Sequence, residues 1–449
     1  MFRELKSERV YVTDDVYADA RAAARAERVM QAVPGTRAER VSYGQLNEIA
    51  GERWGDRPEI LGRCGTIAVP RDPDLVLTTA KFWDAPRKQA FREAYPNLAV
   101  RDLWGFLTHK RRPCGDASER RRRRGCICQS AWELFSAEGC PFRCAYCGLS
   151  GLNRLFVNIE EYVEHLDEIC ALAPTQRLYK WDNHTDTICF EPEWDATRPL
   201  VEYFARKPGK YLELYAGKSD NIDFLLPLEH AGKTIIQWSV SAATQSTAIE
   251  KETAPWDRRI EAARRCQEAG YIVRFRFSPI IPVQNWKEEN AALIDRIFER
   301  TAPDVISLCA LGWMSLEDAR ACLDFGLLDP DYVAAMESAD GFLQARGFGM
   351  GGGRPIPHDA RAYMFKFLID EIRKHSRTIP ISLCLETLEM WALFEQELGM
   401  PIDATRTPDY YCSCGPMCTP EHRYSSGVTP GRSWFDAPAP RRAPEPAVV

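Results

Sequence analysis

The sequence predicts an α/β fold built around part of an α/β barrel, on two observations. From about Cys126 to Gly312, short apolar strands alternate with amphipathic helices, and repeated strand–helix units give parallel strands joined by right-handed crossovers. A chain of 449 residues is also long enough to bury a large core and to form two or three folded units.

Five strands and two helix boundaries carry this pattern in the central region. Asn158 followed by Glu161 has the cap-then-acid spacing of a helix start, and Gly270 is placed to end a helix over residues 258–268. The expected strands cover residues 177–181, 211–215, 234–241, 272–277 and 304–309.

The change of pattern along the chain predicts four regions. In the first, Asp14 or Asp15 is expected to cap a helix that runs to about Met30, and a second helix covers residues 43–53. The regions are 1–125, an N-terminal α/β extension; 126–312, the barrel core; 313–423, a mostly helical C-terminal domain with helices near 316–325, 359–375 and 387–397 and a cysteine-rich segment; and 424–449, a disordered tail rich in Pro, Arg and Ala.

Composition excludes several classes of protein. No apolar run approaches the ~18–20 residues of a membrane span, and the first residues lack a secretory apolar core, so we expect a cytoplasmic protein with no membrane partner. The net charge of −6 argues against a surface coated by nucleic acid. A local basic run from Arg120 to Arg124 is either a solvated loop or a phosphate-contacting segment.

Sixteen cysteines point to metal or redox chemistry, because a chain without an export signal is not expected to form disulfides. Three of them, Cys170, Cys266 and Cys322, lie in helical patterns and are expected to be buried as small hydrophobic residues.

The most informative cysteines are Cys140, Cys144 and Cys147, spaced C-x3-C-x2-C in one short loop. Three such thiolates can bind three irons of a [4Fe-4S] cubane and leave the fourth iron without a protein ligand. S-adenosylmethionine (SAM) can chelate that iron and be cleaved by an electron from the cluster. The alternative is a zinc loop, although zinc requires a fourth ligand nearby and this is not the usual spacing of a zinc knuckle. Tyr146 is expected beside the cluster or the adenine of SAM.

The motif is typical of radical SAM enzymes, and further segments resemble the spore photoproduct lyase family across roughly residues 100–400. The resemblance implies a partial (β/α)6-type radical SAM barrel, a 5′-deoxyadenosyl radical that abstracts a substrate hydrogen, and pyrimidine-dimer DNA as the substrate of a carbon–carbon lyase. It also implies an external one-electron reductant of the flavodoxin or ferredoxin type. The matching segments are residues 140–151, 212–221, 232–241, 259–282 and 383–391.

Family members bind SAM with a lysine in the strand-3 loop and a serine on strand 4, and the matching residues here are Lys218 and Ser239. Polar and apolar residues alternate along 234–241, which independently directs Ser239 and Ser241 into the barrel lumen. A lysine that follows the end of a strand is well placed to bind the SAM carboxylate. The alternative is that Lys218 is a solvated loop residue.

In the lyase, a cysteine on the strand-2 loop returns a hydrogen atom to the substrate radical, and Cys189 lies near the matching position. A thiol is a good donor because its S–H bond is weak. The alternative is that a cysteine in an Ile-Cys-Phe context is simply buried.

Arg274 and Arg276 share one face of the strand over 272–277, and would point into the barrel if the apolar face packs on helices. An unpaired charge there is expensive, so the pair requires a substrate phosphate or carboxylate, or a glutamate such as Glu213.

Two departures separate the chain from the lyases. Gly148 follows the third cysteine, where lyases carry a tyrosine used in hydrogen return. A late C-x-C-x3-C group could bind a second iron–sulfur cluster or zinc, with Cys384 as a further ligand, or could be a set of free thiols or a redox pair. Its members are Cys412, Cys414 and Cys418, and Cys126 and Cys128 are a further source of ligands.

These departures support a second hypothesis, a radical SAM enzyme that modifies a small anionic molecule or a peptide gripped by Arg276. A third hypothesis is a metal-bound nucleic-acid-binding module without catalysis.

Overall fold

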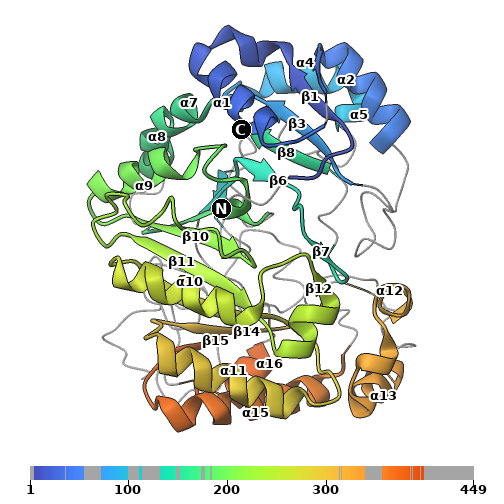
Figure 1. The fold of residues 1–449 in the computed structure, drawn as a ribbon, viewed down its shortest axis with the longest axis vertical. Coiled ribbons are helices and arrows are strands. Elements are labelled where there is room, and N and C mark those ends of the chain that lie inside the picture. The colour runs from blue at the N-terminus through green and yellow to red at the C-terminus, as the bar shows by residue number, and fades with distance from the viewer. Residues whose placement is uncertain are drawn as a thin grey trace, which may run out of the picture.

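The structure is a computed structural model in which two β-sheets lie one above the other along the long axis (Figure 1). The described residues are 5–35, 37–54, 72–99, 111–113, 132–147, 152–172, 177–182, 185–312, 314, 316–338, 356–384, 386, 388–394 and 396–398.

The larger sheet confirms the predicted partial α/β barrel. Its order is β15-β14-β13-β11-β10-β9-β5-β4, and every neighbouring pair is parallel except β4 and β5. All five predicted strands are present. The strands are β4 (Arg111–Pro113), β5 (Trp132–Leu134), β9 (Leu178–Trp181), β10 (Tyr211–Gly217), β11 (Thr234–Val240), β13 (Ile272–Ile280), β14 (Ile306–Ala310) and β15 (Ile381–Leu383).

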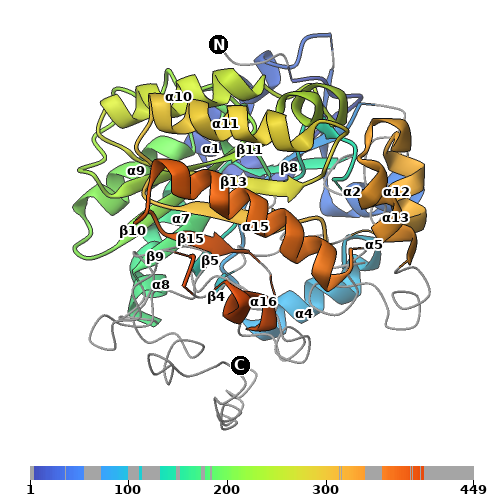
Figure 2. The same cartoon turned by 90° about the horizontal axis from the view of Figure 1, so that it is seen from below.

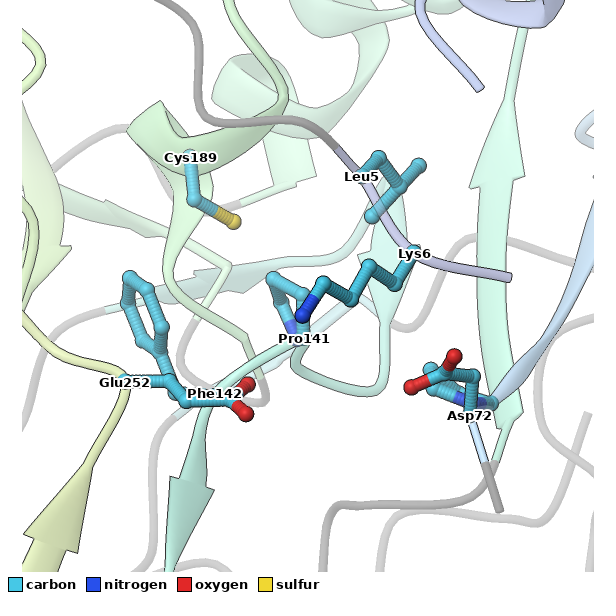
Figure 3. Close-up of a pocket in the computed structure, with 8 residues that line it drawn as sticks. Leu5, Lys6, Asp72, Pro141, Phe142, Cys189 and Glu252 are labelled. Carbon is cyan, nitrogen blue, oxygen red and sulfur yellow. The ribbon is translucent and has the colours of Figure 1, made fainter. Parts of the chain in front are cut away.

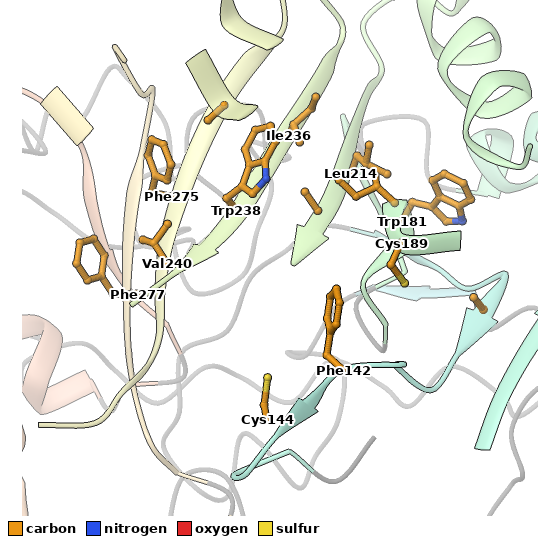
Figure 4. Packing of buried hydrophobic residues seen from close by; sticks show 14 of the residues in the cluster. Phe142, Cys144, Trp181, Cys189, Leu214, Ile236, Trp238, Val240, Phe275 and Phe277 are labelled. Carbon is orange, nitrogen blue, oxygen red and sulfur yellow. The ribbon is translucent and has the colours of Figure 1, made fainter. Parts of the chain in front are cut away.

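Helices cover the outer face of this sheet, with α10, α11 and α15 side by side (Figure 2). The apolar residues of β11 and β13 face these helices: Figure 4 shows Ile236, Trp238 and Val240 near Phe275 and Phe277. The opposite face carries the polar residues of each strand. The helices are α9 (Thr197–Arg206), α10 (Trp256–Glu268), α11 (Trp286–Arg300) and α15 (His358–His375).

The smaller sheet has the order β2-β1-β3-β8-β6, and it crosses the predicted boundary between residues 125 and 126. Its last two strands come from the segment that surrounds the cysteine loop, because β8 pairs in parallel with β3. The strands are β1 (Val10–Thr13), β2 (Ala38–Val41), β3 (Asp74–Thr78), β6 (Ala137–Glu138) and β8 (Leu152–Phe156).

Among the helices beside the smaller sheet, the residue that caps the first helix differs from the predicted one. Asp14 and Asp15 lie in a 3-10 turn, η1 (Asp14–Ala18), and Asp19 caps α1 by accepting from the backbone N–H groups of Arg21 and Ala22. The predicted cap was wrong because the first turn is too tight to continue as an α-helix. The remaining helices here are α1 (Ala20–Gln31), α2 (Tyr43–Ile49), its π-helical extension η2 (Ala50–Trp54), α4 (Ala85–Ala94), α5 (Pro96–Ala99), α7 (Ile159–Glu164) and α8 (Leu166–Leu172).

Buried polar contacts hold the smaller sheet together and join it to the barrel. Asn158 lies at the predicted helix start, as the N-cap residue of α7, and its side chain bonds the backbone N–H and C=O of Ala80 after β3. Arg25 of α1 donates to the carbonyl of Trp194, 2.8 Å away, and pairs with Glu160 of α7 at 2.6 Å. The N-terminal extension is therefore held against the barrel.

The C-terminal part is helical but also supplies the barrel strand β15, which the sequence did not indicate because it is three residues long. Cys170, Cys266 and Cys322 are buried, as predicted. None of the described helices is long and apolar enough to cross a membrane. The elements here are α12 (Leu316–Cys322), η7 (Phe325–Leu327), α13 (Pro330–Ser338) and α16 (Leu388–Leu393).

Candidate active site

The cysteine loop follows β5 at the carboxyl end of the barrel sheet. Its middle, β7 (Arg143–Cys144), pairs antiparallel with β12 (Glu250–Lys251), and the Ala145 N–H donates to the Ile249 carbonyl at 2.9 Å. Gly139 precedes the first cysteine with φ +85°, and a Cβ there would lie 1.9 Å from the Leu152 oxygen. Backbone contacts on both sides therefore set the shape of the loop.

The thiols of Cys140, Cys144 and Cys147 are close enough to influence one another. Burial raises the pKa of Cys140 well above its ordinary value, and negative charge on Asp186, Cys147 and Cys144 raises it further. Burial also raises the pKa of Cys144 to about 12, against the lowering effect of Lys218. Three thiolates held together in this way repel one another, and bound iron would remove that repulsion.

Within the described residues, no three histidine, cysteine or acidic side chains converge as the ligands of a single metal ion do. Cysteine thiolates are the ligands that iron–sulfur clusters take, so the residue types of this loop fit such a cluster.

Lys218 and Ser239, predicted as SAM-binding residues, lie side by side. The Lys218 ammonium donates to the Ser239 hydroxyl at 2.8 Å and to the Ser278 carbonyl at 3.2 Å. Lys218 is only 8% exposed, so the alternative of a solvated loop lysine is wrong. A buried ammonium at the carboxyl end of the strands can bind a carboxylate.

Glu250 is a central residue of the site that the sequence did not indicate. Its carboxylate accepts from Tyr146 at 2.9 Å, from Ser241 at 2.6 Å and from Arg259 at 2.9 Å. The Lys218 ammonium lies 3.8 Å away. Burial acts to raise the pKa of Glu250, but Lys218 and Arg259 together hold it below its ordinary value, so the group stays ionised.

Tyr146 thus connects the cysteine loop to Lys218 through Glu250. Burial, together with negative charge on Cys144 and Glu250, raises the pKa of its phenol well above the ordinary value. Its ring centroid is 5.7 Å from the Lys218 nitrogen. Ser241 faces the same network through Glu250.

Cys189 lies in the 3-10 turn η5 (Thr187–Phe190) that follows β9. Its sulfur donates to the Asp186 carbonyl at 2.8 Å, and burial, then negative charge on Asp186, raises its pKa well above the ordinary value. The Asn221 amide fixes the turn by donating to the carbonyls of Ile188 and Glu191. Cys189 is therefore held as a protonated thiol.

The loop after β9 meets the end of β10 at Asp186 and Gly217. The Asp186 carboxylate accepts from the Lys218 backbone N–H at 2.5 Å, and burial raises its pKa to about 7. Gly217 has φ +59°, and a Cβ there would lie 2.5 Å from Asp186 Oδ2. Only glycine allows this contact without displacement of Lys218.

We therefore expect Gly217→Ala to lower the free energy of unfolding by about 1–3 kcal/mol, measured by urea denaturation. Gly209→Ala is the matched control, because Gly209 has φ +66° and a Cβ added there would meet nothing within 4 Å. Equal losses in the two variants would mean that the Asp186 contact contributes nothing beyond backbone strain.

A cavity of about 250 Å³ opens between the two sheets, next to the cysteine loop. Figure 3 shows Cys189 and Lys6 on opposite sides of Pro141. The amino-terminal edge of the smaller sheet thus meets the carboxyl edge of the barrel. The lining residues are Leu5, Lys6, Asp72, Pro73, Pro141, Phe142, Cys189 and Glu252.

The two arginines of β13 differ from each other, and neither pairs with Glu213. The Arg274 guanidinium makes two bonds to Asp304, of 2.8 and 2.9 Å, near the amino end of the strand. Arg274 therefore has a structural carboxylate partner, which is one of the predicted alternatives, but the partner is Asp304 and not Glu213, whose two carboxylate oxygens have no hydrogen-bond partner among the described residues. Arg276 lies further along β13, with Nη2 2.9 Å from the sulfur of Cys384.

Several predicted features lie outside the described residues. They are Gly148, the basic run Arg120 to Arg124, and the cysteines Cys126, Cys128, Cys412, Cys414 and Cys418.

Comparison with known proteins supports the resemblance found in the sequence. A family model described as spore photoproduct lyase matches residues 129–309. The spore photoproduct lyase of Bacillus subtilis (strain 168) is 28% identical over 176 residues, which are 38% of this chain and 51% of that protein. The lyase of Clostridium acetobutylicum is 24% identical over 185 residues, 39% of this chain and 54% of that protein. The chain thus spans about half the length of the curated relatives it matches.

Solved structures show the same fold over a longer range. A spore photoproduct lyase complexed with dinucleoside spore photoproduct has a TM-score of 0.57 at 15% identity, over 86% of this chain and all of that one. A lyase variant with bound AdoMet and dinucleoside spore photoproduct also has a TM-score of 0.57, at 16% identity, with the same coverage. Together with the cysteine motif, these matches show that the chain is similar to the spore photoproduct lyases.

Proposed function

We propose that the chain is a radical SAM lyase that acts on a pyrimidine-dimer lesion of DNA. The strongest support is the cavity, because it is lined both by Cys189 and by Pro141 and Phe142 of the cysteine loop. A hydrogen donor and a radical-generating loop need to share one space if a substrate is to meet both. The similar proteins are named for the same substrate class.

The contacts support a role for each residue predicted to bind the cofactors. Cys140, Cys144 and Cys147 would hold the cluster, which supplies one electron to break a carbon–sulfur bond of SAM and give a carbon radical. Lys218 would donate to the SAM carboxylate, and Ser239 keeps its ammonium in place.

Cys189 would complete the reaction. Its S–H hydrogen passes to the substrate radical, which forms a C–H bond and leaves the unpaired electron on sulfur. Because burial keeps the Cys189 thiol protonated, the hydrogen is present when the radical forms.

The cavity size favours a substrate that inserts only one part. A volume of about 250 Å³ is below the ~300–1,000 Å³ of pockets that enclose a whole drug-sized ligand. A base lesion that is extruded into the cavity, with its sugar–phosphate backbone outside, fits a volume of this size.

Anaerobic reconstitution followed by reaction with SAM, dithionite and dinucleoside spore photoproduct tests the proposal. We expect about four irons per chain, formation of 5′-deoxyadenosine, and conversion of the lesion to two unlinked nucleosides. About eight irons would support a second cluster that includes Cys412, Cys414 and Cys418. SAM cleavage without lesion conversion would reject the DNA substrate, and absence of SAM cleavage would reject the enzyme class.

Binding of lesion-containing DNA should depend steeply on salt if the basic run contacts phosphates. Five arginines, Arg120 to Arg124, predict a slope of log K against log[salt] of about −4.5, at ~0.9 per phosphate. Replacing all five with glutamine should flatten the slope in fluorescence anisotropy. Replacing the partly exposed Arg296 and Arg300 of α11 is the control, and an equal effect there would argue against a specific role for the run.

A further inference from the structure

Asp182, the residue that follows β9, binds the chain segment that leads into the cysteine loop. Its Oδ1 accepts from the backbone N–H groups of Ser136 and Ala137, at 2.7 and 3.1 Å, and its Oδ2 accepts from the Ser136 hydroxyl at 2.6 Å. Ala137 begins β6 and lies shortly before Cys140, the first cysteine of the loop. Both carboxylate oxygens of Asp182 therefore bond this one segment.

Ser136 lies where the chain passes from the larger sheet to the smaller one, between β5 and β6. Its carbonyl accepts from the Phe156 N–H at the end of β8, at 2.8 Å, and its hydroxyl accepts from the Trp181 indole N–H at 2.5 Å. Asp182 therefore holds the crossing between the two sheets from which the cysteine loop begins.

The backbone of Asp182 extends this contact to the turn that carries Cys189. Its N–H donates to the Leu134 carbonyl at 3.0 Å, and its carbonyl accepts a longer bond of 3.5 Å from the Thr187 hydroxyl. Thr187 is the first residue of η5, the turn in which Cys189 lies. One residue thus bonds both the segment before the cysteine loop and the turn that holds the thiol.

Asp182 adopts a backbone conformation that its contacts must hold in place. Its φ is +53°, in the left-handed region that costs a residue with a side chain about 1–3 kcal/mol. Asp182, Ser136 and Thr187 are almost completely buried. Burial raises the pKa of the Asp182 carboxyl to about 7, against the lowering effect of its three hydrogen bonds from Ser136 and Ala137. The tests below are therefore made at about pH 8, where the carboxylate is the major form.

We propose that Asp182 is a positioning residue, which fixes the turn of Cys189 relative to the cysteine loop so that the thiol reaches the substrate radical. The inference rests on the proposed hydrogen return by Cys189. A hydrogen donor must lie close to the radical that it quenches, and a misplacement of about 1 Å can lower a rate about 100-fold. SAM cleavage should depend less on Asp182, because Lys218 and Ser239, which bond each other, lie on or after other strands.

The first test compares the two products of the reconstituted full chain, 5′-deoxyadenosine and the unlinked nucleosides. Asp182→Gly removes the carboxylate and tolerates the positive φ, so we expect lesion conversion to fall about 10–100-fold while SAM cleavage changes less than about threefold. Asp182→Asn keeps an acceptor oxygen for the two N–H groups and should give a smaller shift in the same ratio. Asp195→Gly is the matched control, because Asp195 has φ +49° but a side chain that is 36% exposed, and it should leave the ratio unchanged.

A parallel loss of both products would make Asp182 a purely structural residue and overturn the inference. If Asp182→Gly loses its cluster, Asp182→Asn decides the question, and an unchanged product ratio in that variant would have the same meaning.

The second test is independent of the substrate. Hydrogen–deuterium exchange of the reconstituted protein, read by mass spectrometry, should be faster in Asp182→Gly by at least about tenfold in both segments that Asp182 bonds, residues 136–137 and 187–190. Asp195→Gly should accelerate neither. Faster exchange in only one of the two segments would overturn the inference, since Asp182 would then not link them. Wild-type protein that cleaves SAM without converting the lesion would reject the proposed function instead, and the exchange rates would still decide whether Asp182 joins the turn to the loop.

Discussion

Glu250→Ala is expected to lower the free energy of unfolding by about 3–5 kcal/mol, because it removes one half of a buried ion pair. Glu250 and Arg259 side chains are both 0% exposed and lie 2.9 Å apart. Without the carboxylate, Arg259 and the nearby Lys218 become buried cations that have lost their counter-ion at this place. The measurement is urea denaturation of the reconstituted protein.

Glu252→Ala is the control for this variant, since it removes the same type of side chain two residues along the chain. The Glu252 side chain is 45% exposed and lies 3.7 Å from Arg143. An exposed pair of this kind contributes ~0–1 kcal/mol. A loss below about 1 kcal/mol in Glu250→Ala would mean that Arg259 finds another partner.

Glu250→Gln separates the charge from the shape. The amide keeps an acceptor for the Tyr146 hydroxyl but not the charge that balances Arg259, so an intermediate loss is expected. The electron paramagnetic resonance spectrum of the reduced cluster, with and without SAM, is a second readout. A structural role alone would lower stability and leave the spectral change caused by SAM intact.

The barrel strands could be predicted because their signal is local. Along β11, polar and apolar side chains alternate, and the structure places the apolar set against helices and Ser239 in the lumen. The three-cysteine loop is equally local, since the spacing of Cys140, Cys144 and Cys147 is visible in eight consecutive residues. Patterns of this length need no knowledge of the rest of the fold.

Glu250 could not be predicted because its burial depends on distant parts of the chain. It lies beside Lys251 and Glu252, and such a charged stretch normally indicates solvent. Its phenol partner, Tyr146, is 104 residues away. The cavity has the same origin, since Leu5 and Asp72 come from the amino edge of one sheet and Cys189 from a loop of the other.

The arginines of β13 show where a local pattern stops being sufficient. The alternation correctly put Arg274 and Arg276 on one face, but Asp304 and Cys384, which contact them, lie on the next two strands of the sheet or their flanking loops. Which carboxylate or thiol meets which arginine depends on strand order and register. Strand order and register cannot be read from the sequence of a single strand.

Cys189→Ala should separate the two halves of the proposed reaction. We expect SAM cleavage to continue, because the sulfur of Cys189 bonds Asp186 while Lys218 and Ser239 bond each other, whereas lesion conversion falls at least about 100-fold. Chromatography of 5′-deoxyadenosine and of the unlinked nucleosides measures both in one reaction. Cys170→Ala, which removes a buried cysteine from the helix α8, should change neither product.

Solvent deuterium gives a second readout that a loss of stability would not mimic. The S–H hydrogen of Cys189 exchanges with water, so the wild-type enzyme in D₂O should place deuterium in the repaired nucleoside. Cys189→Ala should show no deuterium in whatever product it still forms. Deuterium that persists in the variant would assign hydrogen return to another exchangeable group, and Cys189 would then be only a buried residue of the strand-2 loop. Loss of both conversion and deuterium, with SAM cleavage retained, is the result that a thiol donor at this position requires.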